Sequence, residues 1–129
     1  MDKLKTLIVD DDKSIQRLYD KALPEESYLK RFIDNGIEAI EIYQDFKPEI
    51  IILDIYMPDM TGYSVLKKIR EEFEDRTTTI IMSTNVSDQE SIKGCMELGI
   101  QGYIIKPFNF KEVGTKVMQY YNFQRMQHL

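Results

Sequence analysis

The sequence lacks several residues that common sites and environments require. Its only histidine, His128, is the next-to-last residue, which leaves zinc sites and Ser/His or Cys/His catalysis without a histidine to use. Its only cysteine, Cys95, cannot form a disulfide within the chain, and no apolar stretch of signal-peptide length follows Met1. We therefore expect a cytoplasmic protein, a buried Cys95, and chemistry that depends on carboxylates, lysine, hydroxyls and a bound cation.

Long apolar runs and blocks of positive charge are also absent. The longest purely apolar runs have four residues, as in residues 50–53, whereas a helix that spans a bilayer needs about 20. The 17 Lys and Arg residues are outnumbered by 22 Asp and Glu residues, so the net charge is −5 and no basic surface is offered to a phosphate backbone. The sequence therefore predicts no membrane partner and no direct contact with nucleic acid.

What the chain does contain is an alternation of short apolar runs with segments of helical periodicity. This alternation is typical of a parallel sheet covered by helices. The chain has the length of one domain, and no linker, repeat or low-complexity segment divides it. We predict a single α/β domain over residues 1–129, with a core over about 4–121, a short tail over 122–129 and no second domain.

Five strands are expected, each followed by a helix. The predicted strands are residues 6–9, 28–33, 50–53, 79–82 and 102–105. The second strand contains Lys30 and Arg31 and is therefore placed at an edge of the sheet. On the third helix, Arg70 is expected on the solvent face, and the fourth helix is expected to begin at the capping-box pattern Ser87-Asp88-Gln89-Glu90.

Polar residues follow four of the five predicted strands. These are Asp10-Asp11-Asp12 after the first, Asp54 after the third, Ser83-Thr84-Asn85 after the fourth and Lys106-Pro107 after the fifth. Open α/β sheets bind ligands beyond the carboxyl ends of their strands, so these residues are expected at one site. Clustered carboxylates stay ionised when a cation lies among them, and oxygen ligands without His or Cys favour Mg²⁺. The metal would attract a phosphoryl group, for which an aspartate is the nucleophile, Lys106 the counter-charge and Thr84 a hydrogen-bond donor.

These segments resemble the receiver domains of two-component response regulators over almost the whole chain, from about residue 4 to residue 121. The similarity is carried by Leu7-Ile8-Val9-Asp10-Asp11, Leu53-Asp54-Ile55-Tyr56-Met57-Pro58-Asp59-Met60-Thr61-Gly62, Ser83-Thr84 and Gly102-Tyr103-Ile104-Ile105-Lys106-Pro107-Phe108. The intervals fit the family as well, with 43 residues from Asp11 to Asp54, 30 more to Thr84 and 22 more to Lys106.

The resemblance implies a flavodoxin-like, doubly wound sheet of five parallel strands in the order 2-1-3-4-5, with five helices and a cis bond before Pro107. It also implies that Asp54 is phosphorylated by a histidine kinase or a histidine phosphotransfer protein. The implied Mg²⁺ ligands are Asp10, Asp11, Asp54 and the backbone carbonyl of Tyr56, the phosphoryl contacts are Lys106 and Thr84, and the switch residues are Thr84 and Tyr103. An effector protein would then bind in trans, at the face formed by the fourth helix, fifth strand and fifth helix.

Three positions beside the expected phosphoryl group depart from the common pattern of that family. Tyr56, two residues after Asp54, is bulky where many receivers carry a polar residue, and Val86 is apolar. Because both flank the phosphoryl group, we expect slow access of water and a long-lived phosphoprotein. Asn85 takes a position that is often a small residue, and its bulk is expected to hinder the switch.

Two other functions fit part of the sequence. A Mg²⁺-dependent phosphatase of the haloacid dehalogenase type also uses an aspartate nucleophile, but it usually needs a second aspartate two residues later, where this chain has Tyr56. A phosphorylation-independent interaction module would not need the chemical positions that this chain retains. We therefore predict a stand-alone response regulator without an output domain, with at most autophosphorylation and autodephosphorylation activity.

Overall fold

Five parallel strands form one sheet in the order β2-β1-β3-β4-β5, which confirms the order that the family resemblance implied. The computed structural model describes residues 2–85 and 89–127. The strands are β1 (Leu4–Val9), β2 (Tyr28–Ile33), β3 (Ile50–Asp54), β4 (Thr79–Asn85) and β5 (Gly102–Lys106). The helices are α1 (Lys13–Ala22), α2 (Gly36–Phe46), α3 (Gly62–Lys67) with the π-helical turn η1 (Lys68–Glu72), α4 (Gln89–Leu98) and α5 (Phe110–Gln127). The β2 strand lies at an edge, as predicted.

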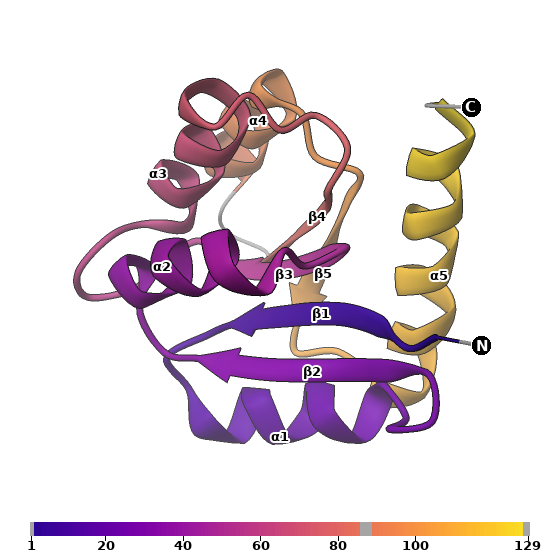
Figure 1. The fold of residues 1–129 in the computed structure, drawn as a ribbon. Helices are drawn as coiled ribbons and strands as arrows, with labels where there is room; N and C mark the ends of the chain where they lie inside the picture. The colour runs from indigo at the N-terminus through magenta and orange to yellow at the C-terminus, as the bar shows by residue number, and fades with distance from the viewer. Residues whose placement is uncertain (1, 86–88, 128–129) are drawn as a thin grey trace.

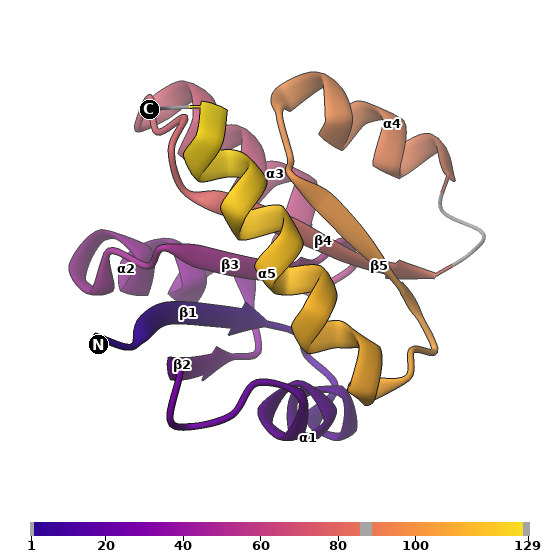
Figure 2. The same cartoon turned by 90° about the vertical axis from the view of Figure 1, so that its right-hand side faces the viewer.

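Helices cover both faces of the sheet, with α2, α3 and α4 on one face and α1 and α5 on the other (Figures 1 and 2). Each face buries its own apolar core. Along β3, Ile51 and Leu53 pack into the core under α2, α3 and α4, and Ile50 and Ile52 pack into the core under α1 and α5. This two-sided burial explains why the strand is a continuous apolar run. Cys95 lies in the first of these cores and is buried, as predicted.

Side-chain caps fix where four of the described helices begin, α1, α2, α3 and α5. Asp12 accepts a hydrogen bond from the backbone N–H of Ser14 at 2.8 Å and caps α1, and Asn35 and Thr61 cap α2 and α3 in the same way. Asn109 accepts from the N–H of Lys111 and marks the start of α5. The predicted cap at Ser87-Asp88 lies outside the described residues, among which α4 begins at Gln89.

Three strands are longer than predicted at the end where the polar residues lie. Parallel pairing continues from Asp54 to Ser83 and from Asn85 to Lys106, so these polar residues belong to the sheet itself. The apolar pattern ends earlier than the backbone ladder, because backbone hydrogen bonds do not depend on the polarity of the side chain. Asp54, Thr84 and Lys106 are therefore held by the sheet itself, whereas Asp10 and Asp11 directly follow β1.

The prediction for Arg70 is wrong, since its side chain is buried and only 2% of the residue is exposed. The guanidinium donates to the carbonyl oxygens of Gly99, Asp75 and Thr78 at 2.9 Å each, and to Oε1 of Gln101 at 3.0 Å. The physical reason lies in η1, where the N–H of Phe73 donates to the carbonyl of Lys68, five residues earlier. A π-turn adds a residue to the turn and shifts the helix faces away from the 3.6-residue period that the prediction assumed.

None of the described helices is long and apolar enough to cross a membrane.

Candidate functional site

Three carboxylates and one ammonium group meet at the carboxyl edge of the sheet. Asp10 and Asp11 follow β1, Asp54 ends β3 and Lys106 ends β5. Asp10, Asp11 and Asp54 each place a carboxylate oxygen within 4.8 Å of the other two. Nζ of Lys106 lies 2.8 Å from Oδ2 of Asp10 and 3.3 Å from Oδ1 of Asp54. The sequence predicted all four as site residues, and the structure brings them together.

The carboxylate of Asp10 is fixed in place by its own neighbours. Its backbone N–H donates to the carbonyl of Ile33, and its Oδ1 accepts from the N–H of Asp12 at 2.9 Å. Nε2 of Gln16 donates to the Asp10 carbonyl at 2.7 Å. Asp10 is 1% exposed, whereas Asp11 is exposed to solvent, so the cluster has one closed side and one open side.

The electrostatics of the cluster leave it short of positive charge. Burial, followed by the charge of Asp10, raises the pKa of Asp54 to about 6, although Lys106 opposes this shift. Burial would lower the pKa of Lys106, but its hydrogen bond to Asp10 and the charges of the two carboxylates raise it instead. Lys106 is therefore firmly protonated, and one cation faces three carboxyl groups.

This donor set fits a hard divalent cation. The ligand atoms are carboxylate oxygens, and no histidine or cysteine lies among them. The exposed side at Asp11 gives a hydrated ion access, which suits Mg²⁺ because it keeps several of its water molecules when it binds to proteins. An ion here would also offset the charge of Asp10, which adds to burial in raising the pKa of Asp54.

The carboxyl end of β4 adds hydroxyl groups to the same edge. Thr84 is 3% exposed, and its Oγ1 donates to the carbonyl of Asn85 at 3.4 Å. Ser83 faces the other side of the sheet, where its hydroxyl lies 2.7 Å from the hydroxyl of Tyr19 on α1. Asn85 is exposed, and Val86 lies outside the described residues. Because side chains alternate along a strand, Thr84 lies on the opposite face of β4 from Ser83 and Tyr19.

Tyr56 reaches from the loop after β3 to helix α4. Its side chain is 54% exposed, and its hydroxyl lies 3.2 Å from Oγ of Ser91. The sequence predicted that Tyr56 flanks the site but not that it contacts α4, because nothing in the local pattern around Ser91 indicates a partner 35 residues earlier. The side chain of Tyr56 thus links the loop after β3 to helix α4.

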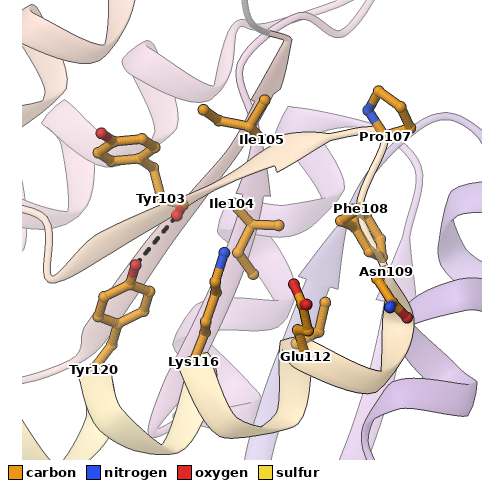
Figure 3. Close-up of a pocket in the computed structure, with 10 residues that line it drawn as sticks. Tyr103, Ile104, Ile105, Pro107, Phe108, Asn109, Glu112, Lys116 and Tyr120 are labelled. Carbon is orange, nitrogen blue, oxygen red and sulfur yellow. Dashed lines mark hydrogen bonds between the residues drawn. The ribbon is translucent and has the colours of Figure 1, made fainter.

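Tyr103 lies on β5 away from the cluster. It pairs with Met82 on β4, two residues before Thr84 and therefore farther from the carboxyl ends of the strands. Its ring is 37% exposed and points away from α5, while its carbonyl accepts a hydrogen bond from the hydroxyl of Tyr120 at 3.3 Å (Figure 3). Tyr103 therefore occupies an outward position.

A groove of about 440 Å³ separates β5 from the first half of α5 (Figure 3). Ile104 and Val113 belong to its buried apolar lining, and the charged residues Glu112 and Lys116 stand over it. Tyr103 and Tyr120 also line it, so the groove offers aromatic, apolar and charged contacts within one surface.

Comparisons by sequence and by structure both match this chain to response regulators. A family model described as the response regulator receiver domain matches residues 6–118. The chain is 35% identical to the chemotaxis protein CheY of Halobacterium salinarum over 104 residues. This match covers 81% of this chain and 85% of that protein. It is 36% identical over 115 residues, or 89% of this chain, to the "Probable transcriptional regulator ycf27" of Guillardia theta, of which it spans 44%.

Solved structures show the same fold. The chemotaxis response regulator CheY4 of Vibrio cholerae matches with a TM-score of 0.84 and 28% identity, over 92% of this chain and 99% of that one. A CheY-like response regulator receiver domain protein of Methanospirillum hungatei matches with a TM-score of 0.87 and 25% identity, over 98% and 99% of the two chains.

Proposed function

Because this chain belongs to the family of response regulator receiver domains, we propose that it is a Mg²⁺-dependent phosphoacceptor of a two-component system, phosphorylated at Asp54. Receiver domains are signalling proteins and generally not enzymes. The observation that carries the proposal is the position of the Asp54 carboxylate, with Asp10 and Asp11 on one side and the Lys106 ammonium 3.3 Å from its Oδ1.

The proposed reaction is a phosphoryl transfer from a phosphohistidine of a histidine kinase or a histidine phosphotransfer protein. A carboxylate oxygen of Asp54 attacks phosphorus, and the new O–P bond forms as the P–N bond breaks, with the electron pair leaving on the imidazole nitrogen. Lys106 would neutralise a phosphoryl oxygen, and the Thr84 hydroxyl would donate a hydrogen bond to another. Mg²⁺, held by Asp10, Asp11, Asp54 and the Tyr56 carbonyl, would supply the remaining positive charge.

The signal would be a change in the population of two conformations. Phosphorylation would favour the conformation in which Thr84 contacts the phosphoryl group and Tyr103 turns from its outward position toward the interior. An effector protein in trans would then bind the face of α4, β5 and α5. The groove between β5 and α5 supports this choice, because Tyr103 itself lines it.

We infer that residues 1–129 fold and work as one receiver domain, and that this domain acts in the cytoplasm. Tyr56 and Val86 would slow the attack of water on phospho-Asp54, and Asn85 would hinder the movement of Thr84. The exposure of the Tyr56 ring at the edge of the site is consistent with such a shield.

Intact-mass measurement after incubation with acetyl phosphate tests the proposal. We expect one added phosphoryl group on the wild type in the presence of Mg²⁺, and none without Mg²⁺ or on Asp54→Asn. Turnover of a generic phosphate ester without a stable adduct would instead indicate a phosphatase. Metal binding without an adduct from either acetyl phosphate or a phosphorylated histidine protein would contradict the phosphoacceptor role.

A further inference from the structure

The loop between β3 and α3, residues 55–61, carries the carbonyl of Tyr56 that the proposed function assigns to the metal. At its base the loop is closed tightly. The N–H of Gly62 donates to the carbonyl of Ile55 at 2.7 Å, and a Cβ at Gly62 would lie only 2.1 Å from the carbonyl oxygen of Asp54. The two ends of the loop are therefore locked together beside the phosphoacceptor.

The far side of the loop is held by Asp59, which the sequence marks only as part of the matching segment. Its Oδ1 accepts from the N–H of Gly36 at 2.9 Å and its Oδ2 accepts from the N–H of Ile37 at 2.9 Å. Its Oδ1 also accepts from the N–H of Met60 at 2.8 Å, within the loop. One carboxylate thus joins the loop to the first turn of α2, which runs beside the loop in Figure 1.

The junction leaves little space between the two segments. A Cβ at Gly36 would lie 2.8 Å from Cβ of Met60 and 2.9 Å from its carbonyl oxygen, so the close approach requires glycine. Asn35 caps α2 through the N–H of Glu38, which leaves the N–H groups of Gly36 and Ile37 for Asp59. The loop and the helix are matched to each other in both shape and hydrogen bonding.

Tyr56 lies between these two anchors, and its own side chain is largely exposed. Apart from the contact of its hydroxyl with Ser91 on α4, the ring is not buried, so the loop backbone places the carbonyl. We propose that Asp59 is a positioning residue of the Mg²⁺ site, which sets the affinity for the ion by holding the loop on α2 and does not contact the ion. This inference rests on the proposed function.

Calorimetric titration of the full chain with MgCl₂ tests the inference. We expect Asp59→Asn and Asp59→Ala to raise the Kd for Mg²⁺ by about tenfold, the lower end of the effect of removing groups that orient metal ligands. Asp59→Asn keeps the size of the side chain but turns an amide N–H₂ group toward a backbone N–H. Gly36→Ala should raise the Kd as well, because it separates the same two segments from the other side.

Glu38→Gln is the matched control, because it removes one negative charge from the same first turn of α2 without breaking a contact to the loop. Its Kd should stay within twofold of the wild type. Urea denaturation in EDTA shows whether each variant is folded, so a change in Kd is separated from a change in stability. Asp59→Asn is the decisive variant if Asp59→Ala is poorly folded.

The outcomes separate the two proposals. Wild-type binding that is lost in Asp11→Asn, with a Kd raised more than threefold in Asp59→Asn and unchanged in Glu38→Gln, supports the role of Asp59. The same wild-type binding with a Kd raised threefold or less in Asp59→Asn overturns that role and leaves the phosphoacceptor proposal intact. Wild-type protein that binds no Mg²⁺ overturns both.

Discussion

Asp54 is a buried carboxyl group that must be ionised to accept a phosphoryl group. Only 7% of the residue is exposed, and burial raises its pKa to about 6 in the folded protein. The folded state therefore binds the Asp54 proton more tightly than the unfolded state does, for which the pKa is 3.8. Without metal, the ionised form of this residue lowers the stability of the fold.

We expect Asp54→Asn to be more stable than the wild type at pH 7.5 in EDTA, by at most about 3 kcal/mol from a shift of about two pKa units. Because the carboxyl loses its proton as the pH rises from about 4 to about 6, the difference should grow over this range and be constant above it. Urea denaturation of both proteins between pH 4 and pH 8 measures the difference. A difference that is independent of pH would contradict this account of Asp54.

We expect Tyr56 to slow the dephosphorylation of Asp54 through its ring more than through its hydroxyl. Tyr56→Asn opens the exposed side of the site and is expected to shorten the lifetime of the phosphoprotein severalfold. Tyr56→Phe keeps the ring but loses the contact with Ser91, and its lifetime should stay close to that of the wild type. Dephosphorylation followed after removal of the phosphodonor measures both lifetimes, and equal rates in wild type and Tyr56→Asn would show that the ring is no shield.

Among the elements, η1 and the loop before β4 form a polar network at the end of the sheet opposite the site. Asp75 is its centre, since it accepts hydrogen bonds from the hydroxyls of Tyr43 and Thr78 and from the N–H groups of Thr77 and Thr78. Burial works to raise the pKa of Asp75, but these hydrogen bonds outweigh it and hold the pKa at about 2. The ionised carboxylate therefore stabilises this corner of the fold.

We expect Asp75→Asn to cost at most about 2 kcal/mol at pH 7, since its pKa lies about two units below the unfolded value. A carboxyl with a lowered pKa contributes its stability above pH 4 and loses it as the pH falls toward 2. The free energies of unfolding of wild type and Asp75→Asn should therefore converge in acid. Glu71→Gln, at an exposed position of η1, is the control and should match the wild type throughout.

The same elements show what the sequence could and could not predict. Strand order, the edge position of β2 and the burial of Cys95 follow from apolar runs, charge and family resemblance, and all are observed. The inward position of Arg70 could not be predicted, because a π-turn changes the face on which it lies and one of its partners, the carbonyl of Gly99, lies 29 residues later. The contacts of Asp59 with α2 could not be predicted either, since its partners there lie 22 and 23 residues earlier.

At the scale of the whole molecule, the sheet brings four separated segments, at the ends of β1, β3, β4 and β5, into one site. Residues that are 43, 30 and 22 positions apart in the sequence meet because parallel strands place their carboxyl ends at one edge. The strands also form the cores on both faces. An ion that joins carboxylates of β1 and β3 should therefore stabilise the fold as a unit.

Mg²⁺ at ten times its Kd should raise the free energy of unfolding by about 1.4 kcal/mol, provided that the unfolded chain does not bind it. For a chain of this length the melting temperature should rise by a few degrees. Thermal unfolding in MgCl₂ and in NaCl of equal ionic strength measures the effect. Asp11→Asn should lose the rise because it removes the exposed ligand while Asp10 and Asp54 remain paired with Lys106. A rise that persists in Asp11→Asn would mean that the stabilising ion binds somewhere other than the acidic cluster.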